Sequence, residues 1–120
     1  MLRTSLLVLL LMTAGCAAEQ QATIAPAAAQ RDALVQDGRE IAEAQCSSCH
    51  AVGPYGDSPN PRSPTFRTLL SRYHADVLRE ELIAGIRVAH PMPQFQFNPQ
   101  GTDALIAYLE SIQQPADAAP

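Results

Sequence analysis

Cys46, Cys49 and His50 form the pattern Cys-Ser-Ser-Cys-His near the middle of the chain. Two thiols at this spacing, followed at once by an imidazole, are the attachment signature of a c-type haem. Both sulfurs reach the vinyl groups along one porphyrin edge, and the histidine then falls beneath the iron. This motif constrains the fold most, because a short chain that holds a porphyrin must build its core around that group.

Three other readings of the motif are open to test. A thioredoxin-like redox pair needs a βαβ setting, which the helical pattern of this chain does not provide. A structural zinc site needs four ligands, and only His74 or His90 could complete it, without the paired spacing of zinc modules. A disulfide between Cys46 and Cys49 would close too small a loop to stabilise the fold much.

Length and charge limit the remaining classes. The chain has 120 residues, 47% of them hydrophobic, so it can form one small domain with a modest core. Its basic residues are all arginine, and its formal net charge is -4. Nucleic-acid binding is excluded as a main role, because phosphate recognition needs clustered positive charge.

Residues 1–16 form an export signal. Arg3 precedes the apolar run 6–12, and small residues then lead into Cys16. The run is shorter than the roughly 20 residues that a membrane-spanning helix needs. Small residues before a cysteine resemble the bacterial lipoprotein box, so Cys16 is a candidate for lipidation and membrane tethering; the alternative is ordinary cleavage near residues 17–18. Both routes predict an exported, periplasmic protein.

The exported chain divides into three parts. Residues 17–31 are rich in alanine and glutamine and predict a flexible tether. Residues 32–114 predict the folded domain, and residues 115–120 predict a disordered tail.

The folded part predicts helices joined by proline-rich loops. Apolar residues recur three and four apart over 33–46, 66–73 and 75–86. A last helix should begin with Asn98 as N-cap and Pro99 at its first position, and continue to about residue 112. No stretch shows strand-like alternation. The expected class is all-α, a small domain of about four helices wrapped round one covalently bound haem.

Met92 is the candidate for the ligand on the other face of the iron. It is the only methionine left after the signal is removed, and it stands between Pro91 and Pro93, which keep the segment extended. The alternatives are that Met92 fills a gap in the core, or that His90 is the ligand. His74 is expected to be a solvated residue at the start of a helix.

With these motifs the chain resembles the class I cytochromes c of the small bacterial type, over nearly all of residues 33–113. The resemblance implies that a glycine of the first helix packs against an aromatic residue of the last, and Gly38 and Tyr108 fit this pattern. It also implies that a proline carbonyl accepts a hydrogen bond from the axial histidine. Pro64 is the candidate for that role, although Pro61 lies close in sequence.

The chain departs from the family in two respects. It contains no lysine, so the lysine ring by which larger members dock acidic partners is absent from the sequence. It also has no tryptophan, which the family places near a haem propionate. A substitute donor is expected from Arg62, Arg67, Tyr73 or backbone amides.

The expected function follows from the coordination. With His50 and Met92 both bound, the iron has no open position, so the protein is expected to be an electron carrier and not an enzyme. Its expected partners are redox proteins: an exported dehydrogenase, a quinol-oxidising complex or a terminal oxidase. It would act as a monomer or as a subunit of a larger complex. The alternative is a haem enzyme or gas sensor, which requires Met92 to dissociate.

Overall fold

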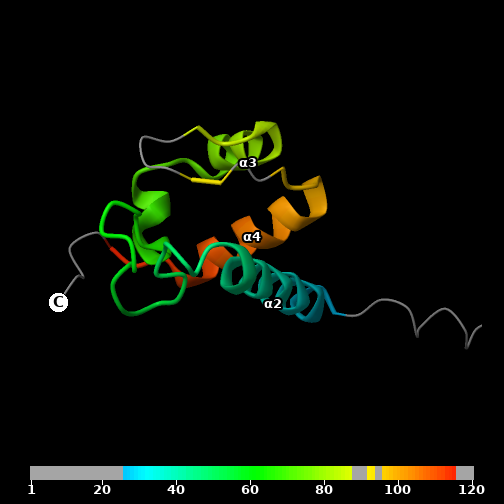
Figure 1. Ribbon diagram of the computed structural model, residues 1–120. Helices are drawn as coiled ribbons and strands as arrows, with labels where there is room; N and C mark the ends of the chain where they lie inside the picture. Colours follow the sequence, from blue (N-terminus) through cyan, green and yellow to red (C-terminus); the bar gives the residue numbers. More distant parts are fainter. Residues whose placement is uncertain (1–25, 88–91, 94–95, 116–120) are drawn as a thin grey trace, which may run out of the picture.

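The computed structural model describes residues 26–87, 92–93 and 96–115. In chain order its elements are α2 (Ala27–Gln45), the 3₁₀ helix η1 (Phe66–Ser71), α3 (Ala75–Ala84) and α4 (Pro99–Ile112) (Figure 1). These residues contain no strand, which confirms the predicted all-α class. The predicted export signal, Cys16 and most of the predicted tether and tail lie outside the described residues. None of the helices described is both long and apolar enough to cross a membrane.

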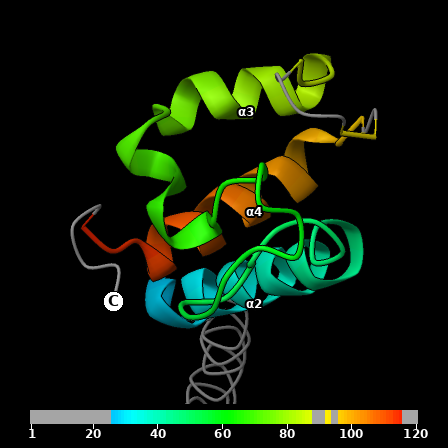
Figure 2. The same ribbon diagram turned by 60° about the vertical axis from the view of Figure 1, so that its left-hand side comes forward.

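Helix α4 is the centre of the fold, with α3 on one side and α2 on the other (Figure 2). Its N-terminus is as predicted, since the Asn98 side chain accepts a hydrogen bond of 2.7 Å from the Gly101 N–H and Pro99 occupies the first position. A run from Ala104 to Leu109 is buried without interruption. Because its neighbours cover it on several sides, α4 is apolar over much more than one stripe.

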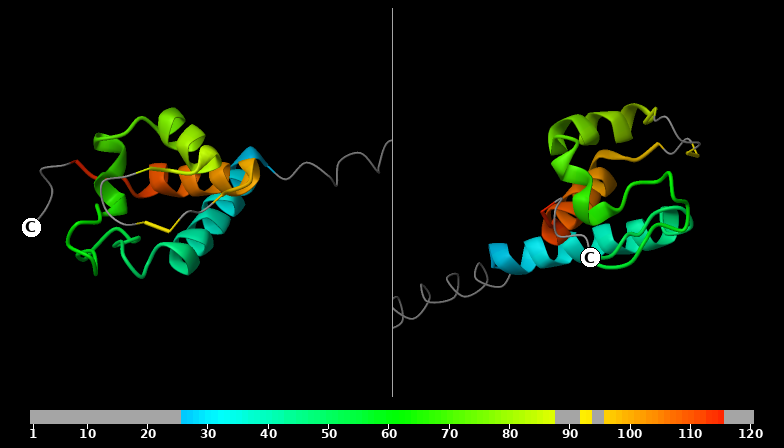
Figure 3. Two further views of the ribbon diagram at one scale, coloured as in Figure 1. Left: turned by 45° about the horizontal axis from the view of Figure 1, so that its top comes forward. Right: turned by 90° about the vertical axis from the view of Figure 1, so that its left-hand side faces the viewer.

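Helices α2 and α4 cross in close contact (Figure 3). Gly38 is buried at the crossing, and a Cβ atom added there would lie 2.8 Å from Tyr108 Cβ and would collide with the Ala104 carbonyl oxygen. Only a residue without a side chain permits this approach. The predicted contact between Gly38 and Tyr108 is therefore present.

The first helix is longer than the sequence predicted. Helix α2 begins at Ala27 instead of residue 33, so residues 27–31, which were assigned to the tether, are helical. This stretch is largely alanine, the residue with the highest helix propensity, and Pro26 precedes it. Its residues are exposed, so intrinsic propensity accounts for this turn better than burial does.

The two middle helices are shorter than predicted. Helix α3 ends at Ala84, and Gly85 follows with a φ of 95°, a left-handed conformation that stops the helix. The segment predicted as a helix over 66–73 is the 3₁₀ helix η1, which ends at Ser71. An α-helix would pair the Leu70 N–H with the Phe66 carbonyl. Here the Leu70 N–H donates to Gln113 Oε1 at 3.0 Å, and Gln113 Nε2 donates to the Phe66 carbonyl at 2.8 Å.

Candidate functional site

A cavity of about 700 Å³ lies among the helices, within the range of about 300–1,000 Å³ that is usual for ligand pockets. Cys46, His50 and Met92 all line it, which brings three of the residues predicted from the sequence to one site. Much of the remaining wall is apolar, and its side chains come from η1, α3, α4 and the segments that flank α3: Phe66, Leu69, Leu78, Leu82, Ile86, Phe97, Leu105 and Leu109.

The motif follows directly on the end of α2. The Cys46 N–H bonds to the Ala42 carbonyl at 3.0 Å, and the His50 N–H bonds to the Cys46 carbonyl at 2.9 Å. This tight turn keeps the motif against the helix end and leaves His50 only 7% exposed.

The His50 ring is oriented by a backbone carbonyl. Its Nδ1 lies 2.8 Å from the oxygen of Pro64. A carbonyl can only accept, so Nδ1 carries the proton and Nε2 has the lone pair that can bind a metal. The structure thus contains the hydrogen bond expected of Pro64, and Pro61 does not supply it.

Phe66 forms a second contact with the histidine. Its ring centre lies 5.3 Å from that of His50, with the planes tilted by 54°. The Phe66 N–H in turn bonds to the Ala51 carbonyl at 2.9 Å, which ties the start of η1 to the residue after the motif. The imidazole is therefore held by a hydrogen bond and by an aromatic contact.

The two cysteines do not form a disulfide. Cys46 is buried, and burial raises the pKa of its thiol to about 11 because the thiolate would lose its hydration. Cys49 is half-buried and does not line the cavity; the Ser48 hydroxyl donates to its sulfur at 3.8 Å.

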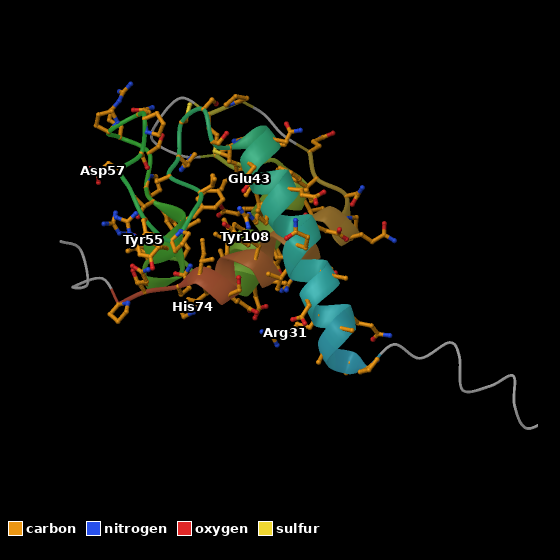
Figure 4. All side chains as sticks on the ribbon, turned by 90° about the horizontal axis from the view of Figure 1, so that it is seen from below. Arg31, Glu43, Tyr55, Asp57, His74 and Tyr108 are labelled. Carbon is orange, nitrogen blue, oxygen red and sulfur yellow. The ribbon has the colours of Figure 1, made fainter. Side chains whose placement is uncertain are left out.

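Met92 is half-buried and lines the cavity, whereas Pro93 beside it is exposed. His90 and Pro91 lie outside the described residues, so the alternative ligand is not located. His74 is exposed and forms no part of the cavity wall, as predicted (Figure 4). In the ranges that the structure describes, no three His, Cys, Asp or Glu side chains gather as a metal site would require. This gives no support to a zinc site.

Only some of the side chains predicted to bind the haem propionates line the cavity. Arg62 and Tyr73 line the cavity, but Arg67 does not. The Arg67 side chain is buried and donates to the carbonyl of Gly56, in the loop between α2 and η1. The expectation for Arg67 was wrong, because helical periodicity does not show which face of a short 3₁₀ helix meets a cavity. Arg72 also lines the cavity and was missed; its position next to Tyr73 was the only available signal.

The residues fit a haem. An imidazole with a defined tautomer and a thioether share a cavity with a mainly apolar wall, and arginine side chains border it. In addition, the Ser63 hydroxyl oxygen is buried against this cavity without a hydrogen-bond partner in the described structure. A large, mostly apolar ligand with anionic groups matches this set of side chains.

Comparisons with known proteins agree with the geometry. The sequence profile of the family described as Cytochrome c matches residues 35–113, which include the whole motif and Met92. No curated protein and no solved structure gave a match. The family carries haem c attached through its cysteines, and its members are in general electron carriers. The family match covers more than half of the chain, and on this evidence the protein belongs to the cytochrome c family.

Proposed function

We propose that this protein carries single electrons between exported redox proteins, with the haem attached to Cys46 and Cys49 and the iron held by His50 and Met92. The observation that carries the proposal is that an oriented imidazole and a thioether line one cavity. The haem supplies a one-electron iron couple, and the protein determines its ligands, its surroundings and its access to solvent.

His50 is suited to be a permanent ligand. The hydrogen bond from Nδ1 to Pro64 fixes the tautomer and raises the basicity of Nε2, as outer-sphere partners of metal-binding histidines do. Because the ring is also in contact with Phe66 and almost fully buried, little reorientation accompanies a change of iron charge.

Met92 is suited to be the second ligand. Thioether sulfur is a soft donor that favours ferrous iron and raises the reduction potential relative to a second histidine. Apolar residues around the cavity, such as Leu78, Leu82 and Leu105, act in the same direction because a low dielectric disfavours the extra charge of ferric iron. With two protein ligands, the iron offers no position to a reactant.

Absorption spectroscopy of the oxidised protein tests this ligation. We expect a weak far-red band from ferric iron bound to sulfur, which Met92→Leu should remove and His90→Ala should leave intact. Persistence of the band in Met92→Leu would overturn the assignment of Met92. Carbon monoxide binding by the reduced wild-type protein at neutral pH would instead favour a haem enzyme or gas sensor.

Mass spectrometry tests the attachment. The mature chain should gain the mass of one haem, and Cys46→Ala together with Cys49→Ala should abolish the gain. The same spectrum tests the export proposal, in which residues 1–16 are removed or Cys16 becomes a lipidated N-terminus. A mature chain that still begins at Met1 would contradict export with cleavage.

The physiological partners we propose are a dehydrogenase or a quinol-oxidising complex as donor and a terminal oxidase as acceptor. Support for this comes from the family and from the export signal, since covalent haem attachment and use both occur outside the cytoplasm. Recovery of such a complex with the tagged, membrane-derived protein would support it, whereas full electron transfer by membranes from which the protein is deleted would contradict it.

A further inference from the structure

Seven arginines lie in the described part of the chain: a first set of four has partners within the protein and does not line the cavity, and a second set of three lines it. Arg31, Arg39 and Arg79 form ion pairs with carboxylates, and none of the three lines the cavity. Arg67 is bound to the Gly56 carbonyl.

The second set borders the cavity. Arg62, Arg72 and Arg87 are exposed and line it, so they lie where it opens to solvent. Their side chains have no ion pair with any residue in the described ranges. Glu81 is the one carboxylate in the described cavity wall. The cavity edge is thus positive in a protein whose net charge is -4, which favours an anionic group at this edge.

A second observation points to the same side of the cavity. Ser63 is 4% exposed, lines the cavity, and its Oγ has no hydrogen-bond partner in the described structure. Buried hydroxyl groups are normally paired, so an unpaired one against a ligand cavity indicates a polar atom of the ligand. Ser63 follows Arg62 directly in the chain.

We infer, on the basis of the function proposed above, that Arg62, Ser63 and Arg72 form the site that receives the haem propionates. Arg62 and Ser63 lie before η1, and Arg72 follows its last residue. A 3₁₀ helix of six residues is about 12 Å long, and both arginines have long, flexible stems, so their guanidinium groups can approach the carboxylates from its two ends. Arg87 also lines the cavity but follows α3, an element that carries none of these three residues, and we do not include it in this site.

Infrared redox difference spectra of the holoprotein test the inference, with haem labelled by ¹³C at the propionate carboxyl carbons. The labelled carboxylate bands should shift in Arg62→Gln, Arg72→Gln and Ser63→Ala. Arg87→Gln removes the same charge from the cavity edge and should leave these bands in place. Arg79→Gln, which removes an arginine outside the cavity, is the second control.

The reduction potential gives an independent readout. Loss of a cation beside the propionates favours the ferric state, so the potential should fall in Arg72→Gln. Arg72→Lys should restore most of the potential, because the charge returns, but not the carboxylate bands, because lysine lacks the planar fork of donors. If Arg72→Gln fails to retain haem, Arg72→Lys and Ser63→Ala decide the question from their bands alone.

Carboxylate bands that are unchanged in all the Arg62, Ser63 and Arg72 variants would overturn this site. The same holds for bands that move only in Arg87→Gln. The failure is distinguishable from failure of the proposed function, because in the first case the wild-type protein still contains covalent haem with the far-red sulfur band. In the second case that band or the haem itself is missing from the wild-type protein.

Discussion

The crossing of α2 and α4 and the wall behind His50 are held together in different ways. At the crossing, the backbone of Gly38 lies against Ala104 and Tyr108, and shape complementarity excludes even a methyl group. The wall, residues 51–71, instead receives hydrogen bonds on its backbone from side chains of other segments. Shape fixes where the helices lie, and polar contacts then fix how the histidine ring is turned.

The polar contacts on this wall come largely from the end of α4 and the residues after it. The Tyr108 hydroxyl donates to the Val52 carbonyl at 2.9 Å, and Gln114 donates to Pro54 and Arg67 carbonyls at 3.0 and 2.7 Å. Figure 4 shows Tyr108 between α2 and the loop that carries Tyr55 and Asp57. Helix α4 and the residues after it therefore stabilise both regions: the helix packs against α2, and polar groups at its end and beyond it bind the wall behind His50.

The largest effect is expected at the crossing. Gly38→Ala should destabilise the holoprotein by about 4 kcal/mol or more, because the added Cβ meets backbone that cannot move independently. Guanidinium unfolding followed by circular dichroism measures the loss. The matched control is Gly53→Ala, since a Cβ at Gly53 meets nothing within 4 Å. Equal stability of the two variants would show that the crossing is not close-packed.

The next largest effect is expected at Gln113, which binds the wall behind His50. Gln113→Ala should cost about 2–3 kcal/mol, because the Leu70 N–H and the Phe66 carbonyl lose their partner. Amide hydrogen exchange should accelerate at Leu70. Gln36→Ala, which removes an exposed pair with Glu40, is the control and should change little. Unchanged exchange at Leu70 would contradict the role given to Gln113.

Tyr108→Phe tests the link between the two regions. The ring keeps its packing, and loss of the hydroxyl bond to Val52 should cost about 1 kcal/mol. Burial raises the pKa of Tyr108 above the ordinary tyrosine value of about 10, so the folded state holds this proton more tightly than the unfolded state. The contribution of the protonated Tyr108 hydroxyl to the stability of the folded state is therefore complete below about pH 10 and is lost as pH rises further.

Unfolding measured against pH checks this sign. The stability of the wild-type protein should fall more steeply above pH 10 than that of Tyr108→Phe. Tyr55→Phe serves as the control, because Tyr55 is 83% exposed. A parallel decline in the wild-type protein and Tyr108→Phe would contradict the prediction.

The smallest effect is expected for an ion pair that spans the two helices. Arg31 and Glu110 approach to 3.9 Å, but both side chains are well exposed. Arg31→Gln should change stability by less than about 0.5 kcal/mol, since solvent screens such pairs. A double-mutant cycle with Glu110→Gln measures the coupling. A coupling above about 1 kcal/mol would show that charge as well as shape holds the crossing.

Local signals in the sequence predicted the features that depend on neighbouring residues. The start of α4 follows from Asn98 and Pro99, and the motif from Cys46 to His50 is read directly. The resemblance to a known family supplied two longer-range contacts, that of Gly38 with Tyr108 and that of Pro64 with His50. The individual roles of Cys46, Cys49, His50 and Met92 toward the haem stay predictions.

The features that were missed depend on distant residues or on weak preferences. Segment 66–71 has the periodicity of an α-helix but is a 3₁₀ helix. Gln113, 43 positions beyond Leu70, accepts the hydrogen bond that the Leu70 N–H would donate within an α-helix. Likewise the direction of Arg67 depends on the path of the loop at Gly56. The early start of α2 is favoured by alanine propensity and lacks the apolar contacts that a periodic pattern reveals.

The dependence of η1 on Gln113 has a consequence for how the protein matures. Hydrogen bonds that join positions so far apart in the chain close late in folding, because the long intervening loop must be ordered first. On the export route proposed above, the chain would pass through a translocon from its N-terminus and would expose Cys46 and Cys49 well before Gln113 emerges. The thiols would then be accessible for haem attachment during an interval in which the wall behind His50 has not yet closed.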